Sequence, residues 1–116
     1  MSIHLITEKA NTTQIYEMLE ALESYIKLAV DVEQRILAGG GDLHADCEQV
    51  LIENGSQQEN VWGADWIPFI KMVTFESLIN IRPAQNNFTM QVADPELKGK
   101  IESIVRELLE ENNEQS

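Results

Sequence analysis

The stretch IKLAVDVE, residues 26–33, alternates between two sets of side chains along its whole length. The mainly apolar set is Ile26, Leu28, Val30 and Val32, and the other set is Lys27, Ala29, Asp31 and Glu33. Successive side chains of a β-strand point to opposite faces, so a period of two with β-branched residues predicts a half-buried strand. We expect it to continue to about residue 37 and to meet the glycines at 39–41.

The next segment, GGGDLHADCEQVLIENG at residues 39–55, allows two interpretations. Its apolar residues fit a helical stripe over 42–53 that would end at Asn54 and Gly55. Asn-Gly between two runs is also a strong hairpin signal, because both residues accept positive φ. In that interpretation residues 42–53 form a second strand, joined to the first by a two-residue turn at Gly39 and Gly40.

Pairing of the strands favours the hairpin interpretation. Turns at 39–40, 54–55 and 68–71 place Trp66 opposite Val73 and bring many apolar side chains to one face. That face would carry Val30, Val32, Ile36, Leu43, Ala45, Cys47, Trp62, Ala64, Trp66, Val73, Phe75, Ile79 and Ile81. A slip of one residue would invert a strand and destroy this agreement. We therefore predict an antiparallel meander of about four strands, with a weak edge strand at 3–6 and a possible fifth strand over 88–92.

Two helices flank the predicted sheet. Residues 11–24 carry an apolar stripe, and Asn11 with Gln14 forms a capping-box pattern. Asp94 and Pro95 mark the start of a C-terminal helix through about residue 109. The predicted fold class is α+β, with both helices covering one apolar face in two layers. We expect a single domain over 1–110 and an acidic disordered tail over 111–116.

The composition narrows the classes of function. Twenty acidic against eight basic residues give a net charge of −12, which argues against nucleic acid as a ligand. No apolar run is long enough to cross a bilayer, and the N-terminus does not resemble a signal peptide. One cysteine cannot form an internal disulfide. We expect a cytoplasmic protein of bacterial type with no membrane partner.

The predicted register also gathers acidic residues on the polar face of the sheet. It places Glu33 opposite Asp46 and Asp31 opposite Glu48, and like charges across a ladder repel unless something neutralises them. These four carboxylates are candidate ligands of a divalent cation, although no recognised metal-binding motif is present. The alternative is a solvated acidic face, and no other cofactor is predicted.

His44 and Asp65 are predicted neighbours on the same polar face. A carboxylate that orients an imidazole is half of a general-base pair, so His44, Asp65 and also Arg82 are candidate catalytic residues. Structural hydrogen bonding is the simpler explanation of the pair. Cys47 points into the core in the strand interpretation, whereas in the helix interpretation it shares a face with His44. Gly63 is expected to mark a bulge or a close approach of backbone.

Three segments of the chain resemble a known family. The run GGGDLHADCEQVLIENGSQQENVWGADWIP, then FESLINIRP and ADPEL, is similar to a small bacterial protein family known only as a domain of unknown function. The resemblance covers roughly residues 25–109 and implies a small, soluble, stand-alone protein. It implies no activity, cofactor or site residue.

These observations lead to two hypotheses of function. The first is a binding or regulatory module whose polar sheet face or exposed sheet edge contacts a protein partner or another copy of the chain. The second is a metal-dependent or general-base enzyme that uses the acidic sheet face.

Overall fold

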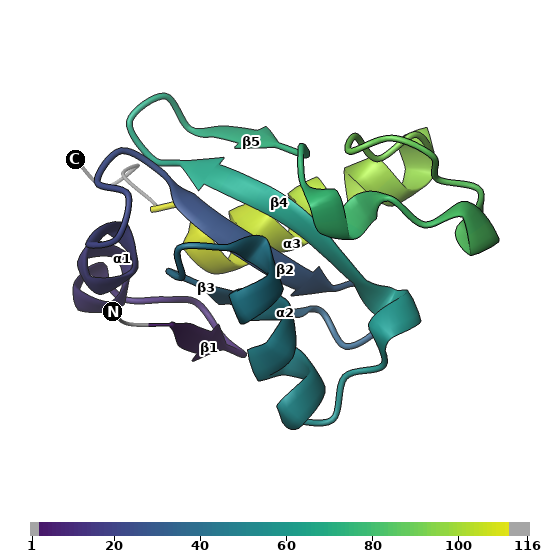
Figure 1. Ribbon diagram of the computed structural model, residues 1–116. Helices are drawn as coiled ribbons and strands as arrows, with labels where there is room; N and C mark the ends of the chain where they lie inside the picture. Colours follow the sequence, from purple (N-terminus) through teal and green to yellow (C-terminus); the bar gives the residue numbers. More distant parts are fainter. Residues whose placement is uncertain (1–2, 112–116) are drawn as a thin grey trace.

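The protein is described by a computed structural model that covers residues 3–111 (Figure 1). Its helices and strands are β1 (His4–Ile6), α1 (Thr12–Leu19), β2 (Ile26–Asp31), β3 (Ile36–Gly39), α2 (His44–Glu53), β4 (Val61–Ile67), β5 (Met72–Thr74) and α3 (Pro95–Leu109). Short 3-10 turns occupy Gln58–Asn60, Leu78–Asn80 and Pro83–Gln85. The predicted tail lies outside the described residues from 112 onward. No helix within the described range is long and apolar enough to cross a membrane.

The five strands form one antiparallel sheet in the order β1-β3-β2-β4-β5. The predicted α+β class is therefore confirmed, and so is the weak edge strand near the N-terminus. The predicted β4–β5 hairpin is also confirmed, because Trp66 lies opposite Val73. The central strand β2 pairs with β3 on one side and with β4 on the other, so it holds the middle of the sheet.

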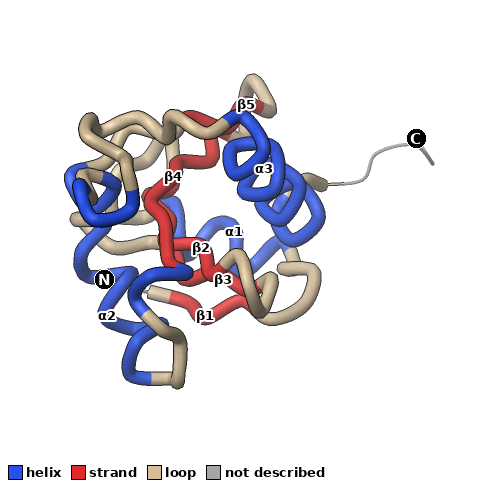
Figure 2. Tube along the Cα trace, turned by 90° about the vertical axis from the view of Figure 1, so that its right-hand side faces the viewer, coloured by secondary structure: helices blue, strands red, loops and turns tan. Residues whose placement is uncertain are grey.

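The first face of the sheet, on which Leu28 and Trp66 lie, is covered by α1 and α3 (Figure 2). It forms the larger core, and it confirms the alternation predicted for residues 26–32. Both covering helices begin where the sequence predicts: Asn11 and Gln14 close a capping box, and Asp94 accepts a hydrogen bond from the Glu96 amide at 2.9 Å. α1 ends at residue 19, five residues earlier than expected.

The second face is covered by α2, on the opposite side of the strands from α3 (Figure 2). A smaller core there contains Ala29, Ala38, Cys47, Leu51 and Val61. Short side chains in the strands let the helix lie close to the sheet. The molecule thus has three layers rather than the predicted two.

The strand predicted over 42–53 is wrong, because most of this segment is helix α2. The chain reverses earlier than the glycines, at residues 32–35. There the Asp31 carboxylate accepts hydrogen bonds from the backbone amides of Glu33 and Gln34 at 2.9 and 3.0 Å, which builds the turn between β2 and β3. The chain therefore leaves the sheet after Gly39. Gly55, whose φ is 103°, follows the end of α2 and does not make a hairpin.

The strands predicted beyond β5 are also wrong. The segment 77–93 is irregular, and the side-chain amide of Asn80 takes the place of a neighbouring strand. Asn80 Oδ1 accepts from the Gly63 amide at 2.8 Å, and Asn80 Nδ2 donates to the Gly63 carbonyl at 3.1 Å. Asn87 donates to the Asn80 carbonyl at 2.7 Å and accepts from the Ala93 amide at 2.9 Å. A Cβ on Gly63 would lie 2.6 Å from Ser77, which confirms the predicted close approach.

Candidate functional site

A pocket of about 530 Å³ opens on the second face, between the start of α2, strands β2, β4 and β5, and segment 77–93. Five of its twelve lining residues lie on the strands or directly beside them, and the other seven come from α2 with its N-cap and from segment 77–93. The lining residues are Tyr25, Lys27, Leu43, His44, Ala45, Asp65, Thr74, Glu76, Ser77, Leu78, Ile79 and Met90. An apolar concave surface with a few convergent polar groups is typical of a small-molecule site.

The polar floor of this pocket is one row of side chains across three strands. Lys27 on β2 pairs with Asp65 on β4, and Asp65 pairs with Thr74 on β5. Their positions in the alternation place all three on the second face, next to α2. The Thr74 hydroxyl donates to Asp65 Oδ2 at 2.9 Å, so this carboxylate is held from one side by its own sheet.

His44, the first residue of α2, completes the polar cluster. Its Nε2 lies 2.8 Å from Asp65 Oδ1 and 3.1 Å from the Ala64 carbonyl oxygen. The Ala64 carbonyl oxygen can only accept a hydrogen bond. Asp65 Oδ1 belongs to a carboxylate whose other oxygen already accepts from Thr74, so it accepts here too. Nε2 therefore carries the proton. The side chains of His44 and Asp65 are only 11% and 10% exposed, which fixes the geometry of the pair.

The other ring nitrogen, His44 Nδ1, makes no hydrogen bond to any residue in the range 3–111. No unbonded side-chain nitrogen or oxygen in that range is fully enclosed, so Nδ1 has access to solvent. In the neutral ring Nδ1 has a lone pair, which can accept a hydrogen bond or a proton. The predicted neighbours His44 and Asp65 therefore do meet, although across a helix–sheet contact rather than across two strands.

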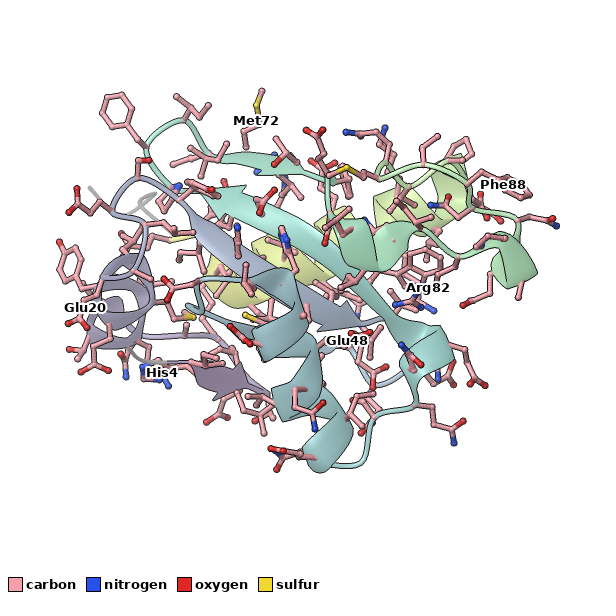
Figure 3. The ribbon with its side chains drawn as sticks, viewed as in Figure 1. His4, Glu20, Glu48, Met72, Arg82 and Phe88 are labelled. Carbon is pink, nitrogen blue, oxygen red and sulfur yellow. The ribbon has the colours of Figure 1, made fainter. Side chains whose placement is uncertain are left out.

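Arg82, the third predicted catalytic residue, lies in a different place. Its guanidinium donates to the carbonyls of Ile79, Gln58 and Val61 and forms an ion pair with Glu48 at 3.3 Å (Figure 3). It also stacks 4.5 Å above the ring of Trp62. Burial lowers the pKa of Arg82, and Glu48 partly opposes this. With its donors turned to the backbone, Arg82 joins α2, β4 and the segment after β5.

The four predicted cation ligands are not assembled by the sheet. Asp31 pairs with Ile36 and Val61 in the ladder, so the expected neighbour Glu48 is not across from it. Instead the buried Asp31 carboxylate is occupied by the turn amides and by the Ser56 hydroxyl at 2.6 Å. Glu33 lies in the β2–β3 turn, and Asp46 and Glu48 lie on α2.

The acidic pairs that motivated a cation site thus depended on the incorrect register. Between residues 3 and 111, no group of three His, Cys, Asp or Glu residues is arranged to hold a metal ion.

Cys47 lies on α2 and is fully buried against the sheet, where its thiol donates to the Lys27 carbonyl at 3.4 Å. Burial raises the pKa of the Cys47 thiol to about 11, with smaller opposing effects from nearby backbone. The thiolate is therefore scarce at neutral pH. The expectation that Cys47 points into a core is confirmed, although it packs with Leu51 on the second face and not with Trp62 on the first.

The apolar half of the pocket was missed from the sequence. Leu78, Ile79 and Met90 come from a segment that was predicted to form strands. Strand alternation would place Leu78 and Ile79 on opposite faces, so it did not indicate that they share a surface. The signal that was available is the helical stripe of 42–53, which would have placed His44 at the beginning of a helix.

The chain belongs to the family described as "Protein of unknown function (DUF5674)", whose model matches residues 4–108. This confirms the resemblance to a family without assigned function. No curated protein matches the chain. No solved structure matches it either.

Proposed function

We propose that this protein is a small binding module whose ligand is a small molecule held in the pocket beside His44. The observation that supports this most is the junction of one fixed polar cluster with an apolar wall. His44, Asp65 and Thr74 form the cluster, and Leu78 and Met90 belong to the wall. Ligand pockets in proteins combine apolar lining with a few placed polar groups in this way.

The volume of the pocket is consistent with this proposal. About 530 Å³ falls within the range of roughly 300–1,000 Å³ that drug-sized ligands occupy. Two sides are formed by regular elements, the sheet and α2, so the site is largely formed before a ligand arrives. A preformed site spends little binding free energy on ordering its own side chains.

A fragment screen followed by two-dimensional NMR tests the proposal. Fragments that bind should shift the amide signals of Lys27, His44 and Thr74. Ala45→Trp places an indole in the pocket and should abolish these shifts. Gln49→Trp is the matched control, because Gln49 lies one turn further along α2 and does not line the pocket. If no fragment binds, or if Ala45→Trp has no effect on binding, the proposal is wrong.

A second candidate function is self-association through the edge strand β5. The hairpin that carries this edge exposes three large apolar side chains: Phe69 is 95% exposed, Ile70 55% and Met72 49%. An unpaired strand edge beside apolar side chains favours pairing with another chain. Light scattering over a concentration series tests it. We expect dimers that Phe69→Ser and Ile70→Ser convert to monomers, and a wild-type monomer at all concentrations would exclude this function.

A further inference from the structure

We infer that the pocket selects uncharged ligands that carry an apolar ring and a hydrogen-bond donor, and that His44 Nδ1 accepts from this donor. This inference rests on the proposed function, because it names the ligand class of the same pocket. Its basis is the combination of a fixed imidazole, the charge of the lining and the apolar wall.

The orientation of the imidazole decides which polar group a ligand needs. Ala64 O and Asp65 Oδ1 both accept from Nε2, so Nδ1 is the ring nitrogen of a neutral His44 that is left for a ligand, and Nδ1 is an acceptor. Asp65 is itself fixed by Thr74, so the ring has no free partner toward which to turn. A ligand that offers an O–H or N–H group at this point donates a hydrogen bond to Nδ1. A ligand that offers only an acceptor places its own lone pair against that of Nδ1 and forms no hydrogen bond.

The charges of the lining argue against an anionic ligand. Two carboxylates, Asp65 and Glu76, line the pocket together with one ammonium group, that of Lys27. The Lys27 ammonium already donates to the Asp42 carbonyl at 3.0 Å and lies beside Asp65 in the polar row. The whole chain carries a net charge of −12, which repels anions at longer range.

The apolar wall sets the rest of the ligand. Leu43 and Leu78 are largely exposed in the empty pocket, and Ile79 and Met90 are half-buried beside them. Covering these side chains removes apolar surface from water and favours binding. Methionine also makes favourable contacts with aromatic rings. A flat ring that bears one hydroxyl or N–H group meets both the wall and the acceptor.

Phenol and anisole are matched probes for this inference. They share a ring and an oxygen, but only phenol is a donor. We expect phenol to shift the pocket amides and to bind about fivefold more tightly than anisole, as one neutral hydrogen bond provides. His44→Phe keeps a ring at the site and should remove this preference. His4→Ala, which alters the other His–carboxylate pair, with Glu17, should retain it. Benzoate should bind more weakly than phenol.

The tautomer of His44 gives a test that needs no ligand. Long-range ¹H–¹⁵N spectra of the neutral His44 imidazole should show the proton on Nε2. A proton on Nδ1 would overturn the inference and leave the pocket proposal standing. Equal affinities for phenol and anisole, or no binding of phenol while other fragments bind, would do the same. Absence of binding by every fragment would overturn the proposed function itself.

Discussion

The two faces of the sheet are built from the same strands but differ in the size and polarity of their side chains. On the first face, large apolar residues such as Leu28 and Trp66 are sealed by α1 and α3. On the second face, small residues lie under α2, and the polar row of Lys27, Asp65 and Thr74 borders an open pocket. The alternation of a strand thus lets one element contribute to stability on one side and to a site on the other. Substitutions on the two faces should separate these contributions.

Trp66→Ala should have the largest effect on stability. Trp66 is almost fully buried in the first-face core, and replacing it leaves a cavity that costs about 3–5 kcal/mol of unfolding free energy. Urea denaturation followed by circular dichroism measures the change. A loss below about 1 kcal/mol would mean that the first face is not the main core of the protein.

High pH should weaken the protein through Cys47 on the second face. Its pKa is raised to about 11 by burial, whereas a thiol in the unfolded chain keeps a pKa near 9.0. Between these values the unfolded chain loses the proton and the folded chain retains it, so stability is unaffected below pH 9.0 and falls above it. Two pH units correspond to roughly 3 kcal/mol. Cys47→Ala should lose this part of the pH dependence, and an unchanged profile would contradict the burial effect.

Gly63→Ala should destabilise the contact between β4 and segment 77–93. The new Cβ would lie 2.6 Å from Ser77, and overpacking of this kind costs about 1–3 kcal/mol. Ser77→Gly in the same chain should recover part of the loss. Gly99→Ala is the matched control, since a Cβ there meets nothing within 4 Å and alanine favours the helix. Thermal unfolding of the three variants makes the comparison, and equal melting temperatures for both alanine variants would contradict it.

Leu78→Ser should have the smallest effect on folding and a clear effect on the pocket. Leu78 is 71% exposed, so its replacement should change the unfolding free energy by no more than about 0.5 kcal/mol. The same change removes apolar surface from the pocket wall, so fragments that bind wild type should bind more weakly. Titration of fragments and urea denaturation on the same sample separate the two effects. Equal fragment affinities would remove Leu78 from the site.

The parts of the fold that could be predicted are those in which the pattern is local. The alternation over 26–31, the capping box at Asn11 and the start of α3 at Asp94 depend on neighbours in the sequence, and each is confirmed. The strand β2, however, ends at Asp31 and not near residue 37. The β2–β3 turn could not be located because its main determinant, Asp31, looked like a member of the polar sheet face. Its carboxylate instead binds turn amides. The pairings predicted across the turns at 39–40 and 54–55 do not form, because residues 44–53 are helical.

The candidate site was predicted in part, and for an incomplete reason. His44 and Asp65 were paired from a strand register that does not exist, and they meet because α2 begins beside β4. The predicted polar position of Asp65 is correct, since parity within β4 does not depend on residues 42–53. The pocket wall required segment 77–93 to fold back over the sheet, which depends on two asparagine side chains rather than on any period.

Those two asparagines have a consequence for how the site can diversify. Asn80 and Asn87 hold the irregular segment with side-chain hydrogen bonds to backbone groups, and backbone groups are present whatever the neighbouring residues are. The side chains between the anchors can therefore be exchanged while the course of the main chain is retained. A library randomised at Leu78, Ile79 and Met90, with both asparagines fixed, should yield folded proteins with altered ligand preference. The segment is in this respect a natural frame for directed evolution.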